Sequence, residues 1–323
     1  MSMPPSAASD PNEAGPHAFA ARVAHDLTQT PRRLPTHDLY DELGSSLFEA
    51  ICQLPWYHIA RTELHLLRVH RDGIFGRLKS VSTVVELGPG SGEKLITLMA
   101  AHSRPRVTVH LVDVSSTALD KASRALSPSP ARAVVTHRAT YEAGLSAIRR
   151  PSAANGKTLV VFLGSNIGNF DPPAADSFLL GVRVALCAGD ALLLGTDLVK
   201  PESKLLLAYD DPLRVTAAFN RNLLVRVNRE LGGDFDVRQF GHRAIWNAPA
   251  SRIEMHLVSL RRQRVQVPAS GIDITFDAGE TIWTESSYKY RLEDLAPMLA
   301  RAGFRVIDQW VEHGFALTLA EAV

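Results

Sequence analysis

Five short apolar runs that alternate with helix-length segments constrain the fold of this chain more than any other feature. They lie at residues 83–87, 107–112, 134–135, 159–163 and 191–194. Runs of this length that are rich in Val and Leu are typical of strands buried on both faces. Strands that alternate with helices form a parallel sheet, so we predict an α/β fold with a doubly wound sheet.

The segments on either side of this region show other periodicities. Apolar residues at helical spacing predict helices, and polar–apolar alternation predicts antiparallel strands. The expected helices span 38–54, 59–78, 215–231 and 292–302, and the expected strands lie within 238–246, 253–267, 304–310 and 315–319. The last two strands are expected to close a β-hairpin at a turn near Gly314.

The length of 323 residues is sufficient for about two folding units. We predict a second, discontinuous α+β domain formed by residues 17–63 and 201–287, which binds the substrate over an α/β domain of residues 64–200 and 288–323. The substrate would lie in the cleft between the two domains. Residues 1–16 are rich in Ser, Pro and Ala and are expected to form a disordered tail.

The composition excludes several classes of protein. The 35 basic and 34 acidic residues leave a net charge of +1, which argues against nucleic-acid or anionic-membrane binding. No apolar run approaches the ~20 residues of a membrane span. The two cysteines, Cys52 and Cys187, are too few for a disulfide scaffold or a cysteine-rich metal site. We therefore expect a monomeric protein of the cytoplasm that acts on a small molecule, without a metal, a nucleic acid or a membrane as partner.

A glycine-rich turn follows the first expected strand. The segment Glu86–Lys94 reads Glu-Leu-Gly-Pro-Gly-Ser-Gly-Glu-Lys and stands before a helix. Its glycines, Gly88, Gly90 and Gly92, let the backbone turn sharply and approach a ligand. Asp113 ends the second expected strand, where a carboxylate can accept hydrogen bonds from both hydroxyls of a ribose. We predict a ribose-bearing ligand; the alternative is a glycine-rich connection without a ligand.

Three kinds of site carry a glycine-rich turn of this type. A dinucleotide fingerprint requires a glycine where this chain has Glu93, and that carboxylate would repel a pyrophosphate. A P-loop requires adjacent Gly, Lys and Ser or Thr, whereas Glu93 separates Gly92 from Lys94. The remaining form, acidic-x-Gly-x-Gly-x-Gly, is the S-adenosylmethionine turn of class I methyltransferases. That cofactor has no phosphate and carries positive charges beside which Glu86 and Glu93 are tolerated, so we predict that it binds here.

A second small-residue loop follows the fourth expected strand. Residues 164–172 read Gly-Ser-Asn-Ile-Gly-Asn-Phe-Asp-Pro. The carboxyl ends of parallel strands face one crevice, so this loop is expected to lie beside the glycine-rich turn. The Asn169 amide offers donors and acceptors suited to the carboxylate or amine of an amino acid. Alternatively, Asn169 and Asp171 only shape the turn before Pro172.

A third cluster, Trp283–Tyr290, contains several hydrogen-bonding side chains. On a strand, Glu285 and Ser287 point to the same face, where the two could bracket one polar ring. The alternative is a strand face that is exposed to solvent.

Together these segments resemble one family, the histidine-specific Nα-methyltransferases of ergothioneine biosynthesis. The resemblance covers nearly the whole chain after about residue 30 and is carried by the segments 40–48, 86–94, 162–169, 194–200, 209–211, 215–222, 228–231, 253–255 and 284–290. The run Val215–Asn222, Val-Thr-Ala-Ala-Phe-Asn-Arg-Asn, is too specific for a generic methyltransferase. The resemblance implies a Rossmann-like class I methyltransferase domain with a separate substrate-binding domain.

The resemblance also implies roles for individual residues. Cofactor contacts would come from Gly88, Gly90, Gly92, Lys94, Asp113, Thr140 and Tyr141, with Asp113 on the ribose. The substrate's carboxylate and amine would be held by Asn169 and Tyr209, with Gly164, Tyr57 and Tyr40 in the same pocket. The imidazole would be bound by Glu285 and Ser287, with Met255 beside them. The residues expected to act on the reacting amine are Asn169, Tyr209 and Tyr57.

Two positions depart from the family pattern. Where the family usually reads Tyr-Tyr-Pro-Thr-Arg, the segment Tyr57–Arg61 reads Tyr-His-Ile-Ala-Arg. We interpret His58 as a solvent-facing or otherwise satisfied side chain rather than a catalytic base. Where the family has Asp-Phe for the adenine amino group, this chain has Thr140 and Tyr141. The Thr140 hydroxyl remains an acceptor, and the lost charge would cost about 1 kcal/mol in cofactor binding.

The resemblance implies transfer of methyl groups from S-adenosylmethionine to the α-amine of L-histidine, up to the trimethylated betaine hercynine. One alternative is an Nα-methyltransferase for a different amino acid or an aromatic amine, since the segment 57–60 is altered. The other is a catalytically weak paralogue that binds the cofactor, since Thr140 replaces an acidic residue.

Overall fold

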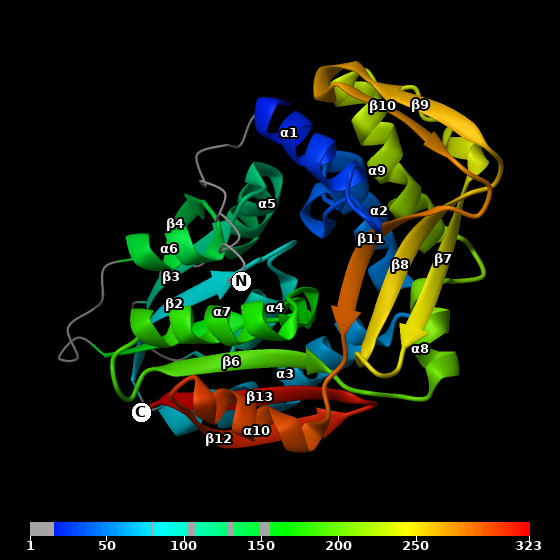
Figure 1. Ribbon diagram of the computed structural model, residues 1–323. Coiled ribbons are helices and arrows are strands. Elements are labelled where there is room, and N and C mark those ends of the chain that lie inside the picture. Colours follow the sequence, from blue (N-terminus) through cyan, green and yellow to red (C-terminus); the bar gives the residue numbers. More distant parts are fainter. Residues whose placement is uncertain (1–15, 79, 103–106, 128–131, 149–155) are drawn as a thin grey trace, which may run out of the picture.

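The computed structural model describes residues 16–78, 80–102, 107–127, 132–148 and 156–323 (Figure 1). The predicted tail, residues 1–16, lies outside this range except for Pro16, which begins the helix α1 (Pro16–Leu27). Within the described range, no helix is both long and apolar enough to cross a membrane.

A seven-stranded sheet forms one side of the molecule, in the order β12-β13-β6-β5-β2-β3-β4. Its strands are β2 (Val81–Leu87), β3 (Val107–Asp113), β4 (Arg132–Arg138), β5 (Lys157–Phe162), β6 (Ala191–Asp197), β12 (Phe304–Glu312) and β13 (Phe315–Ala322). The strands β2 to β6 are parallel, whereas β13 runs antiparallel to both β6 and β12. The predicted α/β fold class and the closing hairpin are confirmed.

Helices cover both faces of this sheet (Figure 1). One face carries α3 (His58–Leu78), α4 (Glu93–Met99) and α5 (Ser116–Leu126), and the other carries α6 (Tyr141–Ala147), α7 (Pro172–Ala185) and α10 (Leu292–Arg301). All seven residues of β6 are buried. Because both faces are covered, the central strands contain continuous apolar runs instead of a polar–apolar alternation, which is why short apolar runs predicted them.

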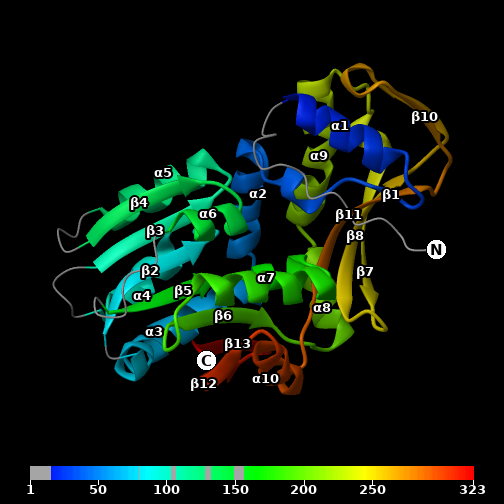
Figure 2. The ribbon, with the colours of Figure 1, turned by 60° about the vertical axis from the view of Figure 1, so that its left-hand side comes forward.

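A second sheet lies on the other side of the molecule (Figures 1 and 2). It has the order β1-β11-β8-β7 and consists of β1 (Arg32–Arg33), β7 (Phe240–Asn247), β8 (Arg252–Ser259) and β11 (Thr281–Tyr288). A two-stranded ribbon of β9 (Gln263–Val267) and β10 (Ile272–Phe276) extends from it. The helix α9 (Val215–Leu231) packs on β7, on β8 and on α2 (Glu42–Gln53). We propose that these elements form the substrate-binding domain.

Several elements differ from those expected. The region 38–54 forms a short 3-10 helix, η1 (Thr36–Leu39), followed by α2, because the Asp41 carboxylate caps α2 by accepting the Gly44 N–H at 2.7 Å. The helix α8 (Glu202–Tyr209) and the 3-10 turn η3 (Asn166–Asn169) are absent from the prediction. The helix α3 runs without interruption across residues 63 and 64, the expected domain boundary.

The chain returns from the second sheet to the first directly beside the loop that contains η3. After β11, the Tyr290 N–H donates to the Asp197 carbonyl at 3.0 Å, at the end of β6. The Tyr290 hydroxyl donates to the Ile167 carbonyl at 3.1 Å. These bonds hold the ends of β6 and β11 and the η3 loop at fixed positions relative to one another.

Candidate active site

A cavity of about 1180 Å³ lies between the carboxyl ends of the parallel strands and the second sheet. Its walls come from the loops after β2, β3 and β5, from α2 and from β11. This volume exceeds the ~300–1,000 Å³ of a typical single-ligand site, so it can hold two small molecules together. The predicted site residues that line it are Tyr40, Tyr57, Gly88, Gly90, Lys94, Asp113, Tyr141, Gly164, Asn169 and Glu285.

The remaining predicted site residues do not belong to this lining; they are Gly92, Thr140, Tyr209, Met255 and Ser287. Gly92 and Thr140 stand immediately before α4 and α6. The Thr140 hydroxyl oxygen caps α6 by accepting a hydrogen bond from the Ala143 N–H at 3.3 Å. This oxygen is therefore engaged within its own helix turn, and a contact of Thr140 with adenine stays a prediction.

The turn after β2 requires glycine at its first position. Gly88 has a φ of +73°, in the left-handed region that favours glycine. Its N–H donates to the Val112 carbonyl of β3 at 2.9 Å. A Cβ on Gly88 would stand 2.9 Å from the Tyr141 hydroxyl oxygen, closer than packing allows. Gly88 and Gly90 line the cavity without a side chain, so the backbone of this turn is accessible to a ligand there.

Asp113 ends β3 as predicted and faces the cavity beside the start of α5. Its Oδ1 accepts a hydrogen bond from the Ser115 N–H at 2.8 Å, which orients the carboxylate. Burial raises the pKa of Asp113, and backbone hydrogen bonds act in the opposite direction. A carboxylate in this position can accept hydrogen bonds from ribose hydroxyls.

Glu86 brings a buried carboxylate to the same end of the cavity. The residue is only 2% exposed, and among the described residues its Oε2 has no hydrogen-bond partner. Burial raises the pKa of Glu86 to about 8, although the nearby Lys94 ammonium lowers it. Ionisation of this buried group is therefore costly in the free protein, and a positively charged ligand at this point would stabilise its carboxylate form.

Lys94 is paired with a residue that is absent from the predicted site. Its ammonium forms an ion pair with the fully buried carboxylate of Glu63 on α3. Both carboxylate oxygens of Glu63 also lie 2.8 Å from the Gly164 nitrogen. Glu63 therefore connects the helix after the glycine-rich turn with the loop after β5. The sequence signal that could have found it is an acidic residue on the buried stripe of α3, between Ile59 and Leu66.

Gly195 on β6 makes room for this carboxylate. A Cβ at Gly195 would stand 1.9 Å from Oε1 of Glu63, which is shorter than any nonbonded contact. Any larger residue at this position would therefore displace Glu63 from Gly164 and Lys94.

The loop after β5 carries Asn169 to the cavity. The Ser165 hydroxyl accepts a hydrogen bond from the Asp197 N–H at 2.9 Å, which anchors the loop to the end of β6. Asn169 is the last residue of η3 and is half-buried in the cavity wall. Asn166, on the same turn, also lines the cavity and is absent from the predicted site.

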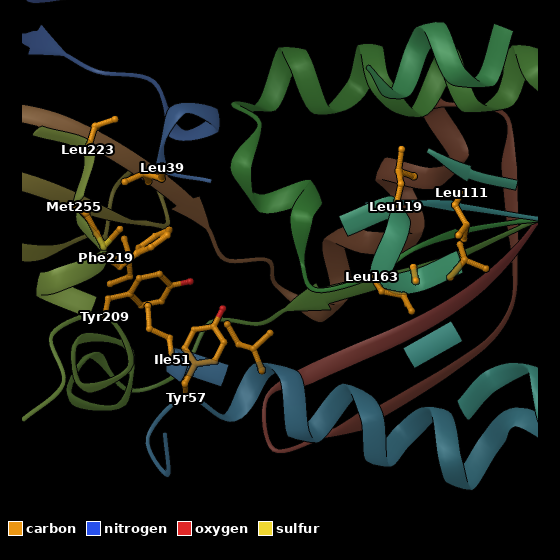
Figure 3. Close-up of a cluster of buried hydrophobic side chains, with 14 of the residues drawn as sticks. Leu39, Ile51, Tyr57, Leu111, Leu119, Leu163, Tyr209, Phe219, Leu223 and Met255 are labelled. Atoms are coloured by element: carbon orange, nitrogen blue, oxygen red, sulfur yellow. The ribbon is translucent and has the colours of Figure 1, made fainter. Parts of the chain in front are cut away.

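Tyr40 and Tyr57 line the other end of the cavity, and Tyr209 packs on Tyr57 outside the lining. The ring centroids of Tyr57 and Tyr209 lie 6.2 Å apart, edge to face (Figure 3). Tyr40 packs edge to face on Phe48 and on Phe219, at 5.5 and 5.4 Å between centroids. Burial raises the pKa of all three tyrosines, so they are neutral phenols near neutral pH. They offer hydroxyl groups and aromatic faces but no tyrosinate base.

Glu285 and Ser287 are both buried on β11, at 8% and 5% exposure, which contradicts the alternative of a solvent-exposed strand face. Glu285 lines the cavity and pairs with Met255 of β8 in the strand register. Ser287 does not line the cavity, and its hydroxyl lies 2.8 Å from the Tyr209 hydroxyl. Burial raises the pKa of Glu285 to about 7, against the lowering effect of the Lys289 charge.

The structure places the His58 side chain in solvent, as we interpreted it from the sequence. It is the first residue of α3, it is exposed, and its Nδ1 lies 3.4 Å from the Arg61 guanidinium. Tyr57, Ile59 and Ala60 line the cavity, whereas His58 does not.

The distinctive run Val215–Asn222 lies on α9 and supports the tyrosine end of the cavity without lining it. Phe219 packs on Tyr40, and the Asn222 amide donates to the Asp41 carboxylate at 2.7 Å. Because Asp41 caps α2, this run positions α2 and Tyr40 together.

S-adenosylmethionine fits the donor and acceptor set of the cofactor end. Its amine and sulfonium are positive and match the unpartnered carboxylate oxygen of Glu86. Its ribose matches Asp113, and its lack of phosphate agrees with acidic residues at both ends of the glycine-rich turn, Glu86 and Glu93.

Comparisons with known proteins show the family to which the chain is similar. The profile of a family described as histidine-specific, S-adenosylmethionine-dependent methyltransferases matches residues 19–322. A histidine N-alpha-methyltransferase of Mycobacterium tuberculosis is 40% identical over 313 residues, which cover 95% of this chain and 96% of that protein. One of Mycolicibacterium smegmatis is 40% identical over 308 residues, 94% of each chain. A solved S-adenosylmethionine-dependent methyltransferase from Clostridium acetobutylicum has a TM-score of 0.44 at 12% identity, covering 87% of this chain and 96% of that chain.

The protein is thus an S-adenosylmethionine-dependent N-methyltransferase with a class I fold. Within that class, the chain belongs to the family of histidine-specific, S-adenosylmethionine-dependent methyltransferases.

Proposed function

We propose that this chain methylates the α-amine of L-histidine and continues to the trimethylated betaine. The observation that carries the proposal is the position of Glu285, a buried carboxylate in the wall of the cavity that also contains Asn169 and Glu86. An imidazole N–H would donate to this carboxylate. An apolar ring would leave it buried and unpaired, so the site would discriminate strongly against such a substrate.

The cofactor supplies an electrophilic methyl group when it is bound. Glu86 would hold its amine, the backbone after Gly88 would accommodate its methionine part, and Asp113 would hold its ribose. Lys94, fixed by Glu63, would keep the start of α4 in place.

The residues at the centre of the cavity would orient the amine. The Asn169 amide is suited to the substrate's carboxylate and amine, and the Gly164 carbonyl would accept a hydrogen bond from the amine. The Tyr57 hydroxyl would accept a hydrogen bond from the amine, and Tyr209 would donate to the carboxylate. Holding the two reacting groups near contact distance supplies about 7–11 kcal/mol of the barrier.

The amine must lose its proton before it reacts, because an ammonium has no lone pair. Raised pKa values exclude the buried Tyr40, Tyr57 and Tyr209 as tyrosinate bases near neutral pH. A positive charge close to the amine favours its neutral form, so orientation and electrostatics suffice without a strong base.

The aromatic wall supports repeated transfer. The faces of Tyr57 and Tyr40 suit a quaternary ammonium, since cations bind aromatic faces. Each product before the last regains a lone pair on losing a proton and remains a substrate.

Mass spectrometry after incubation with S-adenosylmethionine and mixed amino acids tests the proposal. We expect histidine to gain one, two and finally three methyl units, and Glu285→Ala to abolish this with S-adenosylhomocysteine affinity within about twofold of the unsubstituted protein. Methylation of another amino acid instead of histidine would contradict the proposal, as would cofactor binding without turnover of any amine.

A further inference from the structure

Lys289 has a fully buried side chain that contacts the hydroxyls of Tyr209 and Ser287. Its Nζ lies 2.8 Å from the Tyr209 hydroxyl oxygen and 2.9 Å from the Ser287 hydroxyl oxygen. Oδ2 of Asp197 lies 3.0 Å away on the third side, and the Lys289 side chain is 0% exposed. An ammonium has three donors and no acceptor, so all three N–H groups of Lys289 are in use.

The charge of Lys289 is retained in this environment. Burial alone would lower the pKa of Lys289, but the adjacent Tyr209 and Asp197 raise it. The Asp197 carboxylate also pairs with Lys200 through its other oxygen, Oδ1, and in the described part of the chain no hydrogen bond joins Lys200 to either hydroxyl. Lys289 is therefore a permanent donor to Tyr209 and Ser287.

This donation restricts which way the two hydroxyls can point. Each oxygen of the pair accepts from Lys289, and the two oxygens share one O–H bond across 2.8 Å. One hydroxyl hydrogen is then committed between them, and only the other remains for a ligand. A ligand therefore meets one hydroxyl that can only donate and one that can only accept. It cannot meet two donors.

We propose that Lys289 is a positioning residue for substrate recognition, because its two donations leave the Tyr209–Ser287 pair one donor and one acceptor for the substrate. Ser287 donates to Tyr209, so that Tyr209 donates its own hydrogen to the substrate's carboxylate and Ser287 accepts from an imidazole N–H. A single buried cation thereby couples recognition of the two ends of the amino acid. The inference rests on the proposed function and deepens it by assigning how carboxylate and ring are read together.

The position of the two hydroxyls supports this role. Tyr209 packs on Tyr57, and Ser287 is two residues from Glu285 on the same face of β11, so each lies next to a residue that lines the cavity. Lys289 also lies 4.7 Å from the centroid of the Tyr209 ring, which fixes the ring as well as its hydroxyl. The backbone of Lys289 is held in turn by the Ser251 carbonyl, at 2.7 Å.

Calorimetry on the S-adenosylhomocysteine complex tests the proposal with L-histidine and with histamine, which lacks the carboxylate. We expect Lys289→Met to weaken histidine binding about 10- to 100-fold and histamine binding distinctly less. The affinity of the variant for S-adenosylhomocysteine should stay within about threefold of wild type. Lys200→Met is the matched control, because it removes a lysine from the same aspartate without touching either hydroxyl. Lys200→Met should leave the affinities for histidine and histamine within about threefold of wild type.

A fully buried carboxylate that loses a partner can unfold the site, so Lys289→Met is also made together with Asp197→Asn. The proposal is overturned if a variant that binds S-adenosylhomocysteine normally keeps its histidine affinity. It is also overturned if histidine and histamine weaken equally, if Lys200→Met gives the same loss, or if neither Lys289 variant binds S-adenosylhomocysteine. Wild-type turnover is measured first. If the wild type forms no methylated histidine, the proposed function and this inference both fail. If the wild type is active and the Lys289 variant binds histidine as the wild type does, only the inference fails.

Discussion

The carboxylate of Glu63 accepts the backbone N–H of Gly164, and both of its oxygens lie 2.8 Å from that nitrogen. The same carboxylate forms an ion pair with Lys94. Glu63 thus joins α3 to the cofactor end of the cavity through Lys94 and to the substrate end through Gly164. Both ends depend on one buried charge.

Replacing this charge should disturb stability and binding together. Glu63→Gln keeps an acceptor for Gly164 but leaves the Lys94 ammonium without its counter-charge, which costs about 3 kcal/mol in the free energy of unfolding. Urea unfolding measures the loss, and calorimetry should show weaker S-adenosylhomocysteine binding. Glu63→Gln combined with Lys94→Met should recover most of the stability, because neither charge is then unpaired. Additive losses in the double variant would contradict this coupling.

Glu86 should make the stability of the free protein fall as the pH rises. The pKa of Glu86 is about 8 in the folded protein, compared with 4.5 in the unfolded chain. Between these values the folded state holds a proton that the unfolded state has lost, so the free energy of unfolding decreases with increasing pH. Glu86→Gln should remove this dependence and be about 2 kcal/mol or more stable than wild type at about pH 9, with little difference at about pH 5.

Urea unfolding across this pH range, without cofactor, measures that difference. The same substitution should weaken S-adenosylhomocysteine binding about tenfold, because the ligand's amine loses a charged partner. A parallel pH profile in the two proteins would show that Glu86 is not the group that titrates.

Glu285 should impose a maximum on the pH dependence of histidine binding. If Ser287 accepts from one ring nitrogen, the other nitrogen and Glu285 share one proton. Affinity is then highest between the imidazole pKa of about 6.5 and the Glu285 pKa of about 7, and it falls on both sides. Calorimetric titration with histidine, with S-adenosylhomocysteine present, measures this profile without involving turnover.

The Gln amide can donate or accept, so Glu285→Gln should flatten the profile. Ser286→Ala, next to Glu285 on β11, is the control and should keep the maximum. A maximum that persists in Glu285→Gln would assign the titration to another group.

His58→Ala should leave turnover and its pH dependence unchanged. His58 is exposed and does not line the cavity, and the pKa of His58 is lowered by partial burial and by Arg61. Steady-state kinetics across neutral pH should agree with wild type within about twofold. Loss of the alkaline activity or of one limb of the pH profile would identify His58 as a base after all.

The local patterns of the sequence predicted the parts of the molecule that depend on local physics. The strand β6 is buried on both faces, and its first four residues, 191–194, therefore form a continuous apolar run. The turn at Gly88 follows a strand and precedes a helix, and its left-handed φ favours glycine in any such turn. These features depend on neighbours within a few residues, so the class of fold and the position of the cofactor turn could be predicted.

The tertiary structure decided which polar groups are partners. Glu63 and Gly164 are 101 residues apart in the chain, and Tyr209 and Lys289 are 80 apart. No periodicity or spacing connects such pairs, because they meet only when the two sheets and the helix α3 pack together. The same packing left Thr140 as a helix cap and His58 in solvent, whereas it buried Glu285 in the cavity wall. The sequence by itself determined the fold and the location of the crevice, and long-range packing determined the charges and hydrogen bonds within it.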